Sequence, residues 1–184
     1  MIPMALTNRD VAPRYGRSTF EVAQSQQGEQ QTFDELAQVQ SVLADNPQLL
    51  QVLEAANVSP EDKQKLLDNV KQALSPLVSN LIQMLFDYGR IGALPLVITD
   101  YNARFKAAQG IIDATVTTAV TLSDAQVESL GQAIATRFGG KTAQLQQIVD
   151  PTVLGGVKIM SQNQIIDGTV STKLKKLSAA LLAE

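Results

Sequence analysis

The chain has 184 residues, enough for one large domain or two small ones, and 45% of them are hydrophobic. Its formal net charge of -3 argues against nucleic acid, which needs a clustered basic surface, and against tight binding to anionic lipid. The absence of Cys and His excludes disulfides, the usual zinc, copper and haem sites, and Ser-His-Asp or Cys-His catalysis.

Membrane insertion and export are also not expected. No hydrophobic run reaches the ~18 to 20 residues that cross a bilayer. The start of the chain, residues 1–6, is too short for a signal peptide. We therefore expect the protein to stay in the compartment where it is made and to meet a membrane only through its partners.

The first half of the chain is predicted to form six short helices. Asp10 is expected to cap the first helix, with Pro13 in its first turn, where the missing proline N–H costs little. Gly28 is expected to end it, and the last of the six covers residues 94–108 at helical spacing. Three helices between them are expected to begin at a capping residue followed by proline: Asn46-Pro47, Ser59-Pro60 and Ser75-Pro76.

The hydrophobic period changes at Gln109-Gly110. Residues 112–120 alternate between apolar and polar side chains, which predicts a strand. A capping box of Ser123 and Gln126 then opens a helix that Gly139-Gly140 closes. Three strands are predicted after it, over residues 142–149, 153–160 and 164–166, with a turn at 161–163. A last helix is then expected to face the core with four apolar residues: Val170, Leu174, Leu177 and Leu181.

These patterns predict the fold class and the domain organisation. The protein is expected to be α+β, with an N-terminal six-helix bundle followed by a small mixed α/β C-terminal domain. The predicted boundary lies between residues 108 and 109.

A stretch of glycines offers one candidate for nucleotide binding. Gly139-Gly140-Lys141-Thr142 resembles the end of a phosphate-binding loop, in which Lys and a hydroxyl meet phosphate and magnesium. However, Ala135 replaces the leading glycine, and the order of helix, turn and strand is the reverse of such a loop. A helix cap that leads into a strand is therefore the favoured interpretation, and a small nucleotide-binding enzyme is the least favoured function.

The helix that covers residues 75–88 carries apolar residues around most of its circumference. One interpretation is a central helix that its own bundle buries on all sides. The other is a helix with an open face, which forms a groove for an amphipathic helix of a partner protein. Met84 suits such a surface because its thioether is flexible, and the first helix would supply the other wall.

Gly155-Gly156 lies inside one of the predicted strands. Glycine in a strand interior weakens a sheet and often marks a bulge or a close backbone approach. The pair is either a bulge that folding requires or a flat patch on which a partner packs.

Several stretches, in their order and spacing, are similar to one known family. Residues 11–20 are similar to an opening Ala-Arg-x-Tyr-Ala-x-Ala-Leu/Phe helix, and residues 88–91 to an Asn-Gly-Arg-Leu turn. Residues 149–159 and 165–170 are similar to an Asp-Pro-x-aliphatic-Gly-Gly signature and an Ile-Asp-Gly-Ser-hydrophobic segment. The family is the delta subunit of bacterial F-type ATP synthases, counterpart of the mitochondrial oligomycin-sensitivity-conferring protein. Gly16 and Thr19 depart from its pattern, which often has Ala at both positions.

The resemblance implies a non-catalytic stator subunit that links the catalytic head of a rotary, proton-translocating synthase to its peripheral stalk. The first domain would hold the N-terminal segment of an alpha subunit, in a groove formed by Ala12, Tyr15, Gly16, Leu81, Met84 and Tyr88. The second would meet the b subunits of the stalk, at a surface near Leu154, Gly155, Gly156, Asp167 and Gly168.

The resemblance also implies a setting for the protein. It would bind no cofactor or metal, be a monomer when isolated, and lie peripherally at the cytoplasmic face of a bacterial plasma membrane. The alternative is a helical regulatory or scaffold protein with other protein partners, which co-purification would distinguish from a stator.

Overall fold

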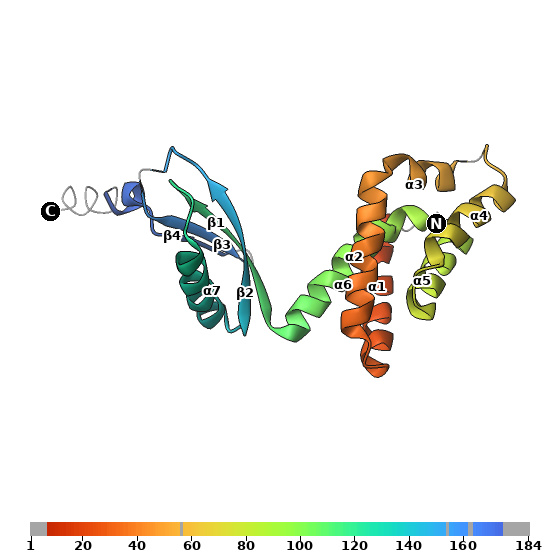
Figure 1. The fold of residues 1–184 in the computed structure, drawn as a ribbon, viewed down its shortest axis with the longest axis horizontal. Coiled ribbons are helices and arrows are strands. Elements are labelled where there is room, and N and C mark those ends of the chain that lie inside the picture. Colours follow the sequence, from red (N-terminus) through yellow and green to blue (C-terminus); the bar gives the residue numbers. More distant parts are fainter. Residues whose placement is uncertain (1–6, 56, 154, 162–163, 175–184) are drawn as a thin grey trace, which may run out of the picture. The chain divides into compact units, whose positions relative to one another are not determined.

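A computed structural model describes residues 7–55, 57–153, 155–161 and 164–174 of the chain (Figure 1). The chain divides into two compact units, Met1–Phe105 and Lys106–Glu184. Helices make up the first unit, and a four-stranded sheet with helices makes up the second. The predicted α+β class is therefore confirmed.

The first unit consists of helices joined by short turns. The three helices that were predicted to begin at proline do so, and a 3-10 turn that was not predicted, η1 (Ile91–Ala93), precedes the last helix. That last helix crosses the boundary between the units. Among the described residues the α-helices are α1 (Asn8–Ser25), α2 (Glu29–Asp45), α3 (Pro47–Glu54), α4 (Pro60–Lys71), α5 (Pro76–Asp87) and α6 (Leu94–Gln109).

Helix α1 begins earlier than predicted. Its cap is Thr7, and Asp10 lies in the first turn, where its carboxylate accepts hydrogen bonds from the Thr7 N–H (3.0 Å) and hydroxyl (2.7 Å). Pro13 consequently lies inside the helix and not in its first turn. The prediction was wrong because a capping box places the acidic residue three positions after the cap, so Asp10 signals a start at Thr7.

The core of the first unit surrounds α6. Tyr101 is fully buried, and its hydroxyl donates a hydrogen bond to the Glu29 carbonyl at 2.9 Å. Burial raises the pKa of Tyr101 to about 12. Phe20 meets the Tyr101 ring edge-on, and Phe33 stacks on Phe105 with ring centroids 4.6 Å apart. These contacts tie α1 and α2 to α6.

The second unit is a sheet with a helix on one face. Strand β1 is central, pairs in parallel with β2 and antiparallel with β3, and β3 pairs antiparallel with β4, so the order is β2-β1-β3-β4. The connection from β1 to the parallel β2 contains the helix, as a crossover requires. The elements are β1 (Ile111–Thr118), α7 (Asp124–Phe138), β2 (Thr142–Val149), β3 (Val157–Ser161) and β4 (Gln164–Asp167).

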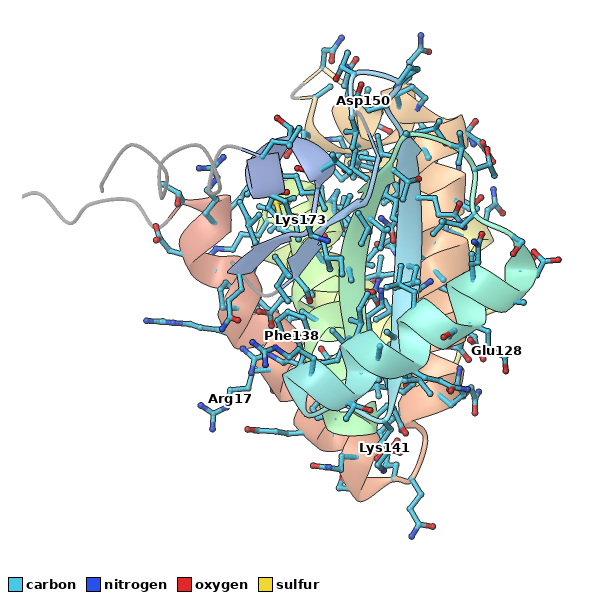
Figure 2. The ribbon with its side chains drawn as sticks, turned by 90° about the vertical axis from the view of Figure 1, so that its left-hand side faces the viewer. Arg17, Glu128, Phe138, Lys141, Asp150 and Lys173 are labelled. Carbon is cyan, nitrogen blue, oxygen red and sulfur yellow. The ribbon has the colours of Figure 1, made fainter. Side chains whose placement is uncertain are left out.

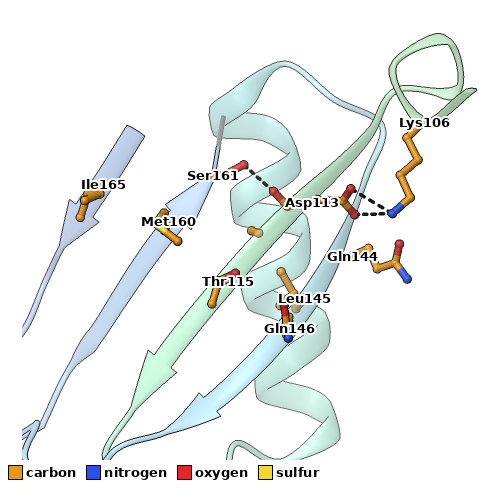
Figure 3. Close-up of a pocket in the computed structure, with 10 residues that line it drawn as sticks. Lys106, Asp113, Thr115, Gln144, Leu145, Gln146, Met160, Ser161 and Ile165 are labelled. Atoms are coloured by element: carbon orange, nitrogen blue, oxygen red, sulfur yellow. Dashed lines mark hydrogen bonds and ion pairs between the residues drawn. The ribbon is translucent and has the colours of Figure 1, made fainter. Parts of the chain in front are cut away.

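Alternate residues of the strands face α7 or the open side of the sheet. Ile112, Ala114 and Val116 of β1 are buried together with Ile134 of α7 and Ile159 of β3. The predicted capping box at the start of α7 is present, since Ser123 and Gln126 exchange hydrogen bonds. Helix α7 packs against β1 and β2 on one face of the sheet, and Asp113 and Thr115 of β1 line a hollow on the other face (Figure 3).

Three predictions for the second half need correction. The strand predicted over 153–160 begins only at Val157, because Gly155 and Gly156 have φ of +125° and +85°, which a regular strand does not allow. Val120 lies beyond the end of β1. The chain is helical over 170–174, as predicted, but Val170 and Leu174 do not face inward, since they are 40% and 56% exposed. Leu177 and Leu181 lie outside the described residues, as do residues 162 and 163 of the predicted turn.

Candidate partner-binding surfaces

A groove runs between α1 and α5 in the first unit. It encloses a cavity of about 290 Å³, and none of its lining residues is charged. Helix α1 contributes Tyr15, Ser18, Thr19 and Val22, and α5 contributes Leu77, Asn80, Leu81 and Met84.

The groove exists because α5 is not buried on all sides. Val78, Ile82 and Leu85 are inside the core, whereas Met84 on the neighbouring edge keeps 39% of its surface exposed. Of the two interpretations that the sequence allowed for this helix, the structure has the one with an open face. An apolar strip flanked by hydroxyl and amide groups suits the amphipathic face of another helix.

The six residues predicted for the groove do not all line it. Tyr15, Leu81 and Met84 do. Tyr88 follows the end of α5 and is 69% exposed, and Ala12 is buried in the core.

Gly16 also lies away from the groove, against α6. A Cβ on Gly16 would lie 2.9 Å from the Cβ of Asp100, closer than real Cβ atoms approach one another. The glycine therefore permits α1 to approach α6. Asp100 is held by an ion pair with Arg104 at 2.6 Å on the same helix.

Five lining residues were missed by the sequence prediction: Ser18, Thr19, Val22, Leu77 and Asn80. A signal for them was present, because each wall follows the spacing i, i+3, i+4 and i+7, counted from Tyr15 and from Leu77. Ser18, Thr19 and Asn80 are polar, so a search for apolar residues alone could not find them, whereas Val22 and Leu77 follow the apolar spacing and were overlooked.

The start of α5 is fixed by a buried carboxylate on α2. Glu35 is 8% exposed, and its Oε2 accepts a hydrogen bond from the Ser75 N–H at 2.9 Å, while Gln31 donates to Oε1 at 2.9 Å. Burial raises the pKa of Glu35, but the hydrogen bonds from Ser75 and Gln31 outweigh this effect, so the pKa lies below its ordinary value. The interaction positions the wall of the groove that α5 provides.

A second hollow, the glycine-turn cavity, lies in the second unit at the end of β1. It has a volume of about 330 Å³, and Val120 at its rim is 68% exposed. Residues from β1 and its following loop, from the first half of α7, and from the turn before β3 line it: Thr118, Ala119, Val120, Leu122, Gln126, Leu130, Gly155, Gly156 and Val157.

The structure brings together the two glycine motifs that were predicted for this surface. Gly155 accepts a hydrogen bond from the Val170 N–H at 3.0 Å, and the Gly168 N–H donates to the Val157 carbonyl at 2.9 Å. A Cβ on Gly156 would lie 2.5 Å from the Gly168 carbonyl oxygen. The close backbone approach explains the glycine pair.

The remaining residues predicted for this surface do not line the cavity or lie outside the described residues. Asp167 and Gly168 support the turn and do not line the cavity. The Asp167 carboxylate accepts hydrogen bonds from the Thr169 N–H and the Thr172 hydroxyl, and the first of these lowers its pKa. Leu154 lies outside the described residues, and Val120, Leu122 and Leu130 were not predicted.

The glycine stretch after α7 is a helix cap. Gly139 has φ of +72°, the Gly140 N–H donates to the Ala135 carbonyl at 2.8 Å, and the Lys141 N–H donates to the Gly110 carbonyl at 2.7 Å. These amides are already bonded within the chain, so they do not form a cradle for phosphate.

The open face of the sheet holds a larger, shallow hollow of about 1010 Å³ (Figure 3). Lys106 and Asp113 form an ion pair at its edge, with Nζ 2.8 Å from Oδ1. The other residues that line the hollow are hydroxyls, amides and apolar groups. Over the described ranges no group of three or more Asp, Glu, His or Cys could hold a metal ion. No helix there is both long and apolar enough to cross a membrane.

Comparison with known proteins identifies the family. The model of the ATP synthase delta (OSCP) subunit family matches residues 11–181. The ATP synthase subunit delta of Lacticaseibacillus paracasei is 46% identical over 181 residues, which cover 98% of this chain and 100% of the relative. That of Lactiplantibacillus plantarum is 37% identical and covers 97% and 99% of the two chains.

A solved structure has the same fold. A chain in the cryo-EM structure of the Toxoplasma gondii mitochondrial ATP synthase hexamer matches with a TM-score of 0.70 and 21% identity, covering 95% of this chain and 98% of that one. The family match spans both units and both candidate surfaces. The chain therefore belongs to the ATP synthase delta (OSCP) subunit family and is a non-catalytic subunit of the peripheral stalk of an F-type ATP synthase.

Proposed function

We propose that the first unit acts as a six-helix bundle that holds the N-terminal segment of an alpha subunit in the groove between α1 and α5. The observation that carries this proposal is the groove itself, whose two walls each present residues at i, i+3, i+4 and i+7. An amphipathic helix presents its apolar face with the same spacing, so its side chains can interdigitate with both walls.

The composition of the groove favours a lasting contact. A stator resists rotation under load and needs tight binding, and an affinity of ~1 nM corresponds to about -12 kcal/mol. Apolar anchors that are fully desolvated supply such energy more effectively than exposed ion pairs, which contribute roughly 0 to 1 kcal/mol each. The groove has apolar residues on both sides and no charged ones.

We propose that the b subunits bind at the glycine-turn cavity of the second unit. The backbone hydrogen bonds between the 155–157 turn and residues 168–170 hold this wall in place, and Val120 offers exposed apolar surface at the rim. On this arrangement the protein lies at the cytoplasmic face of a bacterial plasma membrane, where it is held through the complex.

Calorimetric titration of the full chain with a peptide of the alpha N-terminal segment tests the groove. Met84→Asp should weaken binding by at least ~10-fold, because complex formation would bury a carboxylate without a partner. Met84→Leu, which keeps an apolar side chain of similar size, should bind within a few-fold of wild type. Circular dichroism should show the same helix content for all three proteins. Unchanged affinity of a folded Met84→Asp protein would remove Met84 from the site.

A further inference from the structure

Strand β2 forms one edge of the sheet and lacks the usual protection of an edge. In the described part of the chain it pairs with β1 alone. Its eight residues, Thr142–Val149, include no charged residue and no proline, and most of them are exposed. The flanking charges, Lys141 and Asp150, lie at opposite ends of the strand (Figure 2). Edges of this length and character are prone to pair with another strand.

The opposite edge of the same sheet is protected. Strand β4 has four residues and ends in the charged Asp167, and the chain turns into a helix from residue 170. Short length and charge are two devices by which proteins block pairing at an edge. Because β4 has both devices and β2 has neither, the two edges differ in a way that the fold of this unit alone does not require.

Within the described residues, every second backbone N–H and C=O group of β2 points away from β1 and pairs with no other strand. The N–H groups of Thr142 and Asp150 point towards β1, where they bond to the carbonyls of Gly110 (3.3 Å) and Thr118 (2.8 Å). Successive residues of a strand point their backbone groups to opposite edges. The N–H and C=O groups of residues 143, 145, 147 and 149 therefore face outward, along roughly 20 Å of strand.

We propose that β2 accepts an extended segment of the stalk partner as a fifth strand of the sheet, an inference that rests on the proposed b-subunit contact. The edge is continuous with that contact, because Asp150 bonds to Thr118, which lines the glycine-turn cavity. The matching segment is uncharged along its length, with an acidic residue beside Lys141 and a basic residue beside Asp150. Backbone pairing supplies affinity in such strand additions.

Residue-resolved hydrogen–deuterium exchange tests the proposal in two preparations, the isolated full chain and the purified synthase. The amides of 143, 145, 147 and 149 should exchange rapidly in the isolated chain and at least ~10-fold more slowly in the synthase. The amides of 144, 146 and 148 face β1 and should be slow in both preparations. Such alternation distinguishes strand addition from a partner that merely covers one face.

A pair of variants at one exposed position tests the same contact. Gln147→Pro removes an outward-facing N–H, and an edge strand tolerates proline at such a position. Gln147→Thr keeps the N–H and favours a strand. We expect Gln147→Pro to lower the amount of b subunit that co-purifies with the subunit by at least half, whereas Gln147→Thr should match wild type, with equal circular dichroism spectra.

The outcomes separate this inference from the function on which it rests. Rapid exchange of the four outward amides in a synthase that retains its stalk would overturn the inference and leave the b contact standing. Protection that appears in the isolated chain as its concentration rises would identify a second copy of this chain as the occupant and would also overturn it. Failure of the wild-type protein to co-purify with b would overturn both proposals.

Discussion

Two glycines of this chain are explained by what occupies the space beside them. The Cβ position of Gly16 is taken by Asp100 on α6, and that of Gly156 by the Gly168 carbonyl. Neither explanation is available from the sequence, because each depends on a segment that is distant along the chain. The family pattern, which often has Ala at the position of Gly16, also gives no hint of the contact with Asp100.

Gly16→Ala should therefore lower the free energy of unfolding by about 1–3 kcal/mol, the range for overpacking a well-packed contact. Gly131 on α7 is a control with room, since its nearest neighbouring atom would lie 3.8 Å from an added Cβ. Gly131→Ala should be neutral or stabilise by up to about 1 kcal/mol. Urea denaturation followed by circular dichroism measures both, and equal stability of the two variants would contradict the packing argument.

At the scale of elements, the capping residues and prolines at helix starts allowed most helix starts to be predicted correctly. Proline after a capping residue marks the beginnings of α3, α4 and α5, and the capping box marks that of α7. The misplaced start of α1 and the shortened β3 both involve residues whose role depends on their neighbours. Asp10 serves a cap three residues earlier, and Gly155-Gly156 adopts positive φ to reach the backbone of residues 168–170.

Only three of the six residues predicted for the groove line it, and the reason is again a contact between segments that are distant in sequence. The sequence, read with the family resemblance, correctly named Tyr15, Leu81 and Met84, but it could not show which small residues of α1 face the core and which face solvent. Ala12 and Gly16 are buried because α1 packs against the rest of its unit, and that packing is a tertiary property.

The contact between α2 and α5 predicts a dependence on pH. Glu35→Gln keeps the shape but removes the charge that accepts the Ser75 N–H, and it should cost about 1–2 kcal/mol at pH 7. Because the pKa of Glu35 is lowered by folding, its contribution is complete above the unfolded-state pKa of about 4.3. It is lost as the pH falls through the lower folded-state pKa.

Denaturation of both proteins as a function of pH measures this effect. The difference between wild type and Glu35→Gln should be constant near neutral pH and shrink in acid. A difference that instead grows as the pH falls would show that the carboxylate is not stabilised by these hydrogen bonds.

At the scale of the whole molecule, each of the two units is proposed to bind one partner. The two surfaces use different elements, α1 with α5 in the first unit, and the end of β1 with α7 and the 155–157 turn in the second. Substitutions on exposed residues of one surface should therefore leave binding at the other intact.

Val120→Asp is the counterpart, on the second surface, of the substitution Met84→Asp in the groove. It places a charge at the rim of the glycine-turn cavity and should reduce co-purification of b subunits, while the affinity for the alpha peptide stays within about two-fold of wild type. Val120→Thr keeps the shape and serves as the matched control. Loss of alpha-peptide binding in Val120→Asp would show that the two surfaces are not independent.

Methyl-resolved NMR of the full chain, titrated with the alpha N-terminal peptide, tests whether the groove between α1 and α5 binds the alpha subunit. We expect the methyl signals of the groove residues Val22, Leu77, Leu81 and Met84 to shift in a saturable manner. Those of Val120, Leu122 and Leu130 at the glycine-turn cavity should not shift. Saturable shifts at the second group with none at the first, or no shift at either, would contradict the assignment of the groove to the alpha subunit.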